Sequence, residues 1–177
     1  MTAEQPWSVP VAIHSVPETG RSFTLVADEP TRAAVAKLAS VSALPRLEAH
    51  FDVSLRGRNA LHVTGQVSAT VGQTCVVTLV PIENEVVEDI DLVFAPDAAP
   101  VIVDEEGAQV EVATVDAPEP LIGGTVDLGG IATEFLILAI DPYPRAPGAL
   151  FEPPAPADEG SHPFAALAAL KKGRKDG

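Results

Sequence analysis

The sequence predicts an α+β domain with a twisted, mostly antiparallel β-sheet, and three observations support this class. Segments 46–56 and 61–71 alternate strictly between apolar and polar residues, which is typical of half-buried strands. The intervening segment 57–60 has the composition of a hairpin turn. An apolar segment over about 128–140 has helical spacing and can cover the apolar face of the sheet. The pattern fits an open sheet and also one that curls toward a barrel.

The two alternating segments predict which side chains form the core. In 46–56, Leu47, Ala49, Phe51, Val53 and Leu55 share one face, and the polar residues share the other. The segment 61–71 repeats this pattern as the antiparallel partner. A third strand is expected from Ile82 to Phe94, with an irregular middle. Its apolar residues are Val86, Ile90, Leu92 and Phe94.

The N-terminal part predicts two shorter strands and a helix. Segments 8–14 and 21–27 have strand composition, and a proline and a glycine mark the turn between them. Pro10 places the first of these strands at an edge. A short helix is expected over about 30–40, with Asp28 or Thr31 as its cap.

The second helix, near 128–140, is expected to be buried. Asp127 is its predicted N-cap, and the prolines after Asp141 end it. The glycine pairs around it lack a neighbouring lysine and fit a turn and a helix start better than a phosphate site. Its apolar stripe comprises Leu128, Ile131, Phe135, Leu138 and Ala139, widened by Leu136 and Ile140.

Proline content and charge divide the chain into three parts. Residues 1–145 are expected to form a single α+β domain that contains an acidic loop over about 95–120. A proline-rich linker follows over 146–160. Residues 161–177 predict a short amphipathic helix with a basic tail.

Composition excludes several classes of function. The 177 residues carry a formal net charge of −14, which excludes a diffuse basic surface for nucleic acid, and no DNA partner is expected. No apolar stretch is long enough to cross a membrane. The single cysteine, Cys75, permits no intrachain disulfide and fits a reducing compartment, so a cytoplasmic location is expected.

The sequence shows no catalytic residues, no cofactor motif and no metal site. Cys75 has Thr78 three positions later, where a zinc site would need a second cysteine. The four histidines are scattered without ligand spacing. Cys75 is therefore interpreted as a structural thiol.

The segment from Pro81 to Pro120 contains twelve acidic residues and no basic ones. Such a run is typical of a solvated, self-repelling segment. The alternative is a surface that binds a basic protein or mimics a nucleic acid. Similarly, the basic residues of the C-terminal tail fit either a solubilising tail or the end of a docking helix.

Several motifs in order resemble the YceD family of large ribosomal RNA subunit accumulation proteins. They are Leu61–Val67, Thr74-Cys75, Asp91–Phe94, and Glu119–Gly130 with its continuation to Arg145. The ending His162–Leu167 resembles the short tail of the family. Only Cys75 stands where many members carry a cysteine pair, so no metal role is implied. The resemblance implies a part in producing or stabilising large-subunit ribosomal RNA, without catalysis.

The leading hypothesis is a non-enzymatic factor that binds a basic ribosomal protein or a pre-ribosomal large subunit. An alternative is direct RNA binding through Arg46, Arg56 and Arg58 with the basic tail, and a third is an enzyme with an unfamiliar site. The candidate interaction residues of the leading hypothesis are Glu83, Glu85, Glu88, Asp89, Asp91, Tyr143, Arg145, Phe164, Leu167, Leu170, Lys171 and Lys172.

Overall fold

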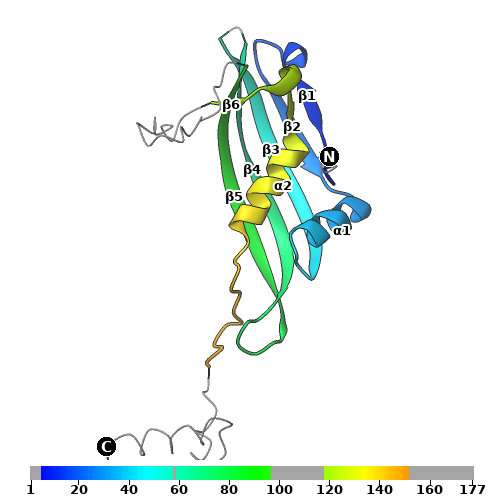
Figure 1. Ribbon diagram of the computed structural model, residues 1–177, viewed down its shortest axis with the longest axis vertical. Coiled ribbons are helices and arrows are strands. Elements are labelled where there is room, and N and C mark those ends of the chain that lie inside the picture. Colours follow the sequence, from blue (N-terminus) through cyan, green and yellow to red (C-terminus); the bar gives the residue numbers. More distant parts are fainter. Residues whose placement is uncertain (1–4, 58, 97–117, 152–177) are drawn as a thin grey trace, which may run out of the picture. The chain divides into compact units, whose positions relative to one another are not determined.

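The computed structural model describes residues 5–57, 59–96 and 118–151, and it confirms the α+β class. The main sheet has the order β2–β3–β4–β5–β6 (Figure 1). Its first four strands are antiparallel, whereas β6 runs parallel to β5. The strands are β2 (Arg21–Val26), β3 (Ala43–Arg56), β4 (Ala60–Thr74), β5 (Pro81–Ala95) and β6 (Glu119–Pro120).

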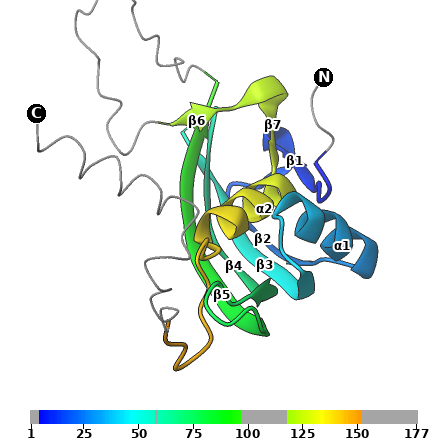
Figure 2. The same cartoon turned by 60° about the horizontal axis from the view of Figure 1, so that its bottom comes forward.

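The sheet is open, so the barrel that the sequence also allowed is wrong. A closed barrel requires pairing between the first and last strands, and β2 pairs only with β3 among the strands described. The helices α1 (Glu29–Leu38) and α2 (Leu128–Ala139) both lie on the same side of the sheet (Figures 1 and 2). Their buried residues join the inward side chains of the strands in one hydrophobic core.

Strands β3 and β4 follow the predicted alternation. Leu47, Phe51, Val63 and Val67 are almost completely buried, and Arg56 pairs with Ala60 across the predicted hairpin turn. The predicted irregularity in β5 is wrong, because its pairing with β4 is continuous over all fourteen pairs. Its apolar spacing is interrupted because Glu88 occupies an inward position opposite Val67, where the side chain is nevertheless exposed.

Asp127 joins the N-terminal segment to α2. Its Oδ1 atom caps the helix by accepting hydrogen bonds from the backbone of Gly129 and Gly130, and it also accepts one from Val9 at 2.7 Å. Its Oδ2 atom accepts a hydrogen bond from Ser8. A Cβ atom at position 129 would lie 2.6 Å from the carbonyl oxygen of Trp7, so glycine is required for this close approach.

The predicted strand over 8–14 is shorter than expected and does not join the main sheet. Strand β1 (Pro10–Ala12) pairs with β7 (Thr125–Asp127) in a separate two-stranded sheet. Ile13–Ser15 form a 3₁₀ turn, η1, which ends the strand. A second 3₁₀ turn, η2 (Ile122–Gly124), precedes β7.

The stripe predicted for α2 is correct except at one position. Leu128, Ile131 and Leu136 are buried, but Leu138 is 75% exposed. Leu138 follows Leu136 by two residues, which turns its side chain about 200° around the helix axis and away from the sheet. Among the helices described, none is long and apolar enough to cross a membrane.

The described residues up to Pro147 belong to one compact unit, and Gly148–Phe151 belong to a second. Most of the expected linker over 146–160 lies outside the described residues. The same holds for the expected terminal helix over 161–177 and for 97–117 of the expected acidic loop.

Gly65 of β4 provides a test of this packing. A Cβ atom there would overlap the backbone oxygen of His50 and lie 2.8 Å from Cδ1 of Phe51. We expect Gly65→Ala to lower the free energy of unfolding by about 1–3 kcal/mol, measured by denaturant titration. Ser54→Ala, on the outer side of β3, is the control and should change stability by less than about 0.5 kcal/mol. Equal stability of the two variants would contradict the described pairing of β3 with β4.

Candidate functional site

The side of the main sheet that faces away from both helices is polar and is uncovered by any described element. We call it the open face. The register aligns its residues in rows across four strands, and it comprises Ser22, Thr24 and Val26 of β2, the even-numbered residues 46–56 of β3 and 62–70 of β4, and the odd-numbered residues 83–93 of β5.

The open face is acidic. Two arginines, Arg46 and Arg56, lie near the opposite ends of its β3 row, and the rest of the face is rich in hydroxyl, amide and imidazole side chains. The excess of negative charge attracts cations and repels phosphate. Its six carboxylates belong to Glu48, Asp52, Glu83, Glu85, Asp89 and Asp91.

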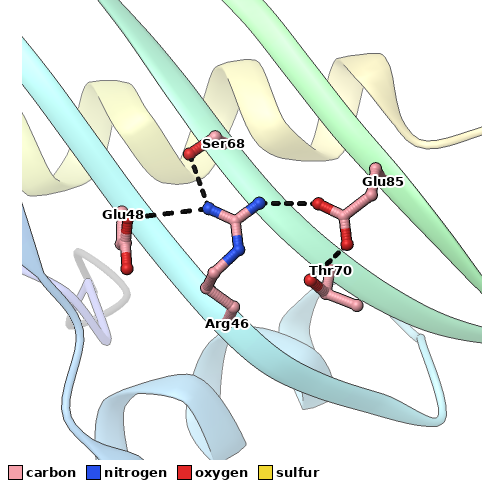
Figure 3. Close-up of polar contacts among 5 residues, drawn as sticks. All are labelled: Arg46, Glu48, Ser68, Thr70 and Glu85. Carbon is pink, nitrogen blue, oxygen red and sulfur yellow. Dashed lines mark hydrogen bonds and ion pairs between the residues drawn. The ribbon is translucent and has the colours of Figure 1, made fainter.

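A cluster around Arg46 shows how these carboxylates are held (Figure 3). The guanidinium donates to Glu85 at 2.6 Å and to Ser68 at 2.9 Å, and it lies 3.6 Å from Glu48. Thr70 donates a further hydrogen bond to Glu85. The bond from Thr70, followed by the one from Arg46, holds the pKa of Glu85 below its usual value, so this carboxylate keeps its negative charge.

Two further contacts between β4 and β5 hold Asp89 and Asp91, two of the other predicted carboxylates. Gln66 donates to Asp89 at 2.7 Å, and His62 lies 2.7 Å from Asp91. Gln66 and Asp89 are directly opposed in the register, whereas His62 is opposite Val93 and reaches Asp91 diagonally; both kinds of cross-strand pair stabilise antiparallel sheets. Asp89 and Asp91 are therefore each held through one carboxylate oxygen, whereas both oxygens of Glu85 are bonded.

The structure brings together four of the five predicted acidic residues. Glu83, Glu85, Asp89 and Asp91 lie on the open face, whereas Glu88 lies on the opposite side of β5. Sequence reasoning missed Glu48 and Asp52 as parts of the same surface. Their position on the polar side of β3 was predicted from the alternation, but only the strand register shows that they neighbour the acids of β5.

The predicted arginine set does not form one patch. Arg46 and Arg56 lie ten positions apart on β3, which separates them by about 33 Å. Arg58 lies outside the described residues. Five members of the predicted tail surface lie outside them as well: Phe164, Leu167, Leu170, Lys171 and Lys172.

Tyr143 and Arg145 lie in the segment after α2, which packs on the connection between β4 and β5. The backbone N–H of Val76 donates to the carbonyl of Pro144 at 2.9 Å, and the side chain of Gln73 donates to the carbonyl of Asp141. Tyr143 is 72% exposed. Tyr143 is therefore held at the end of the sheet, whereas Arg145 lines a groove beside β5 together with Glu85 of the open face.

Cys75 joins the same two segments. Its buried sulfur accepts hydrogen bonds from the backbone N–H groups of Ala146 at 3.2 Å and Thr78 at 3.4 Å. The bond from Ala146 first, and those from Thr78 next, lower the pKa of Cys75 from 9.0 to about 6. Across residues 5–57, 59–96 and 118–151, no group of three or more His, Cys, Asp and Glu side chains is arranged to hold a metal ion.

Comparison with known proteins identifies a family. The model of the family described as large ribosomal RNA subunit accumulation protein YceD matches residues 63–171, which is more than half of the chain. The matched range begins in β4 and includes β5, α2 and the segment that packs on Cys75. Neither the curated proteins nor the solved structures that were searched gave a match.

The hydrogen bonds to Cys75 predict a pH dependence of stability. The folded thiol has a lower pKa than the unfolded one, so the thiolate stabilises the fold fully above about pH 9 and loses that contribution as the pH falls to about 6. We expect the free energy of unfolding of the wild type, relative to that of Cys75→Ser, to increase as the pH is raised from about 6 to about 9. A difference that stays constant over this range would show that the sulfur is not stabilised as a thiolate.

Proposed function

Because the chain belongs to the YceD family, we propose that it supports accumulation of large-subunit ribosomal RNA by binding a basic ribosomal protein or a pre-ribosomal particle, without catalysis. The description of the family assigns it to the accumulation of this RNA. The observation that carries the finer proposal is the open face, with six carboxylates and two arginines on a rigid sheet. The proposal places the protein in the cytoplasm.

The electrostatics of the open face favour a cationic protein as the direct partner. Carboxylates arranged on one side of a sheet add their fields, which steer an oppositely charged partner and raise its association rate. The attraction falls with salt, because the Debye length is only about 8 Å at physiological ionic strength. The hydroxyl and amide groups between the carboxylates can then form direct hydrogen bonds with the docked partner.

Direct RNA binding through the arginines of β3 is less favoured. Arg46 is already bonded to Glu85 and lies beside Glu48, so its charge is largely neutralised. Phosphate approaching it also meets the negative field of the open face. RNA contacts are therefore expected to occur through the bound ribosomal protein or particle.

Neutralising the open face is the main test. The triple variant Glu83→Gln, Asp89→Asn, Asp91→Asn removes three charges, and Glu18→Gln, Glu29→Gln, Glu134→Gln removes three exposed charges elsewhere. Tagged full-length chains are sedimented from cells, and the co-purified proteins and RNA are identified. At low salt we expect the first variant to bind its particle about tenfold more weakly and the second to bind almost normally. Equal binding by both variants would refute the role of the open face.

Replacing Arg46 separates protein binding from RNA binding. Arg46→Ala makes the open face more negative, so we expect binding of a basic protein to be retained or strengthened. The variant should weaken binding if Arg46 contacts phosphate. The measurement is the affinity of the purified chain for its co-purified partner, before and after nuclease treatment. If Arg46→Ala binds more weakly than the wild type before nuclease treatment and this difference is lost after the RNA has been removed, direct RNA binding is favoured.

A further inference from the structure

Strand β5 has a long outer edge that is almost unpaired in the described part of the chain. On its inner side, β5 pairs with β4 from Pro81 to Phe94. On its outer side, the only described partner is β6, which pairs with Phe94 and Ala95. The backbone groups that residues 81–93 direct outward therefore resemble a template for another strand.

A groove of about 350 Å³ follows this edge. Its lining includes the five consecutive residues from Asn84 to Glu88. Consecutive residues of a strand point to opposite faces, so a groove that touches all five lies along the edge of the strand and not over one face. Ala139 and Arg145 complete the wall on the α2 side. An added strand would thus find contacts for the side chains on both of its faces, with the exposed Val87 on one of them.

The charges along the edge select between possible occupants. Glu85, Glu88 and Asp141 line the groove, against one cation, Arg145. Two copies of β5 placed edge to edge would bring carboxylates together, which disfavours self-association. A strand with lysine or arginine side chains would instead be attracted. The edge therefore combines backbone groups that have no partner in the described part of the chain, a groove, and a negative charge that suits a cationic segment.

We propose that the outer edge of β5, over residues 81–93, accepts an extended basic segment of a partner protein as an additional β-strand. Backbone hydrogen bonds supply the affinity, and the carboxylates on both faces of β5 select a cationic segment. This inference rests on the proposed function, because the partner is the same basic protein. It adds the mode of binding, which involves the backbone as well as the charges of the open face.

The test uses the full-length chain and two synthetic peptides of alternating lysine and valine residues. The second peptide is identical except that its backbone nitrogens are methylated, which removes hydrogen-bond donors and keeps the charge. We expect the methylated peptide to bind at least about tenfold more weakly. Binding of the unmethylated peptide should slow amide hydrogen exchange within residues 81–93 and leave exchange in β2, the other edge, unchanged.

Charge reversal provides a matched pair of variants. Glu88→Lys lies in the groove, and Glu18→Lys changes the same charge in an exposed loop. We expect about fivefold weaker peptide binding for the first variant and unchanged binding for the second. Equal affinity for the two peptides would overturn the proposal, as would slowed exchange at β2 in place of β5.

The free chain supplies a further outcome. If the amides of residues 81–93 are all strongly protected before peptide is added, the chain itself occupies the edge, and the proposal is overturned.

Sedimentation of the open-face variants distinguishes the strand-addition proposal from the proposed function. If those variants lose their particle while both peptides bind equally, only the strand addition fails. If the open-face variants still co-sediment with the particle, the proposed function itself is refuted, and the strand addition that rests on it is refuted as well.

Discussion

The antiparallel pairing of β3, β4 and β5 is the constraint on which the rest of the structure depends, and it is continuous from Arg46 to Arg56 of β3 and along all paired residues of β5. β3 and β4 alternate between apolar and polar residues, β5 does so except around Val87 and Glu88, and the register brings like residues into the same rows. One side of the sheet is therefore apolar enough to hold both helices, and the other collects the charges. A shift of one residue in either pairing would move carboxylates into the core, so the burial of one side fixes the arrangement of the other.

The covering helices are attached by few polar groups, and these act at the helix ends. Asp28 caps α1, and Asp127 caps α2 while binding the N-terminal segment. At the other end of α2, the thiol of Cys75 holds the chain that leaves the helix. The bond to Cys75, together with that from Gln73 to the carbonyl of Asp141, holds the chain after α2 near β5, so the groove along the outer edge of the sheet depends on these two hydrogen bonds.

Local patterns predicted the strands and caps, whereas long-range relations were not predictable. The alternation in 46–56 identified the buried face, and Asp127 was recognised as a cap from its position before the apolar segment. The pairing of β1 with β7 leaves no local signal, because composition does not encode the partner of a three-residue strand. The open face combines both cases: the polar sides of β3 and β4 were predicted from the alternation, but which residues of β2 and β5 lie beside them required the register.

The pairing of β1 with β7 has a consequence for how the chain acquires its fold. Strands β2 to β5 are consecutive neighbours, so they can pair soon after they are synthesised. Val9 and Asp127 are 118 positions apart, and closing such a loop costs entropy that only the finished core can offset. The segment around Val9 is synthesised long before α2, yet it can take its final place only after α2 has formed.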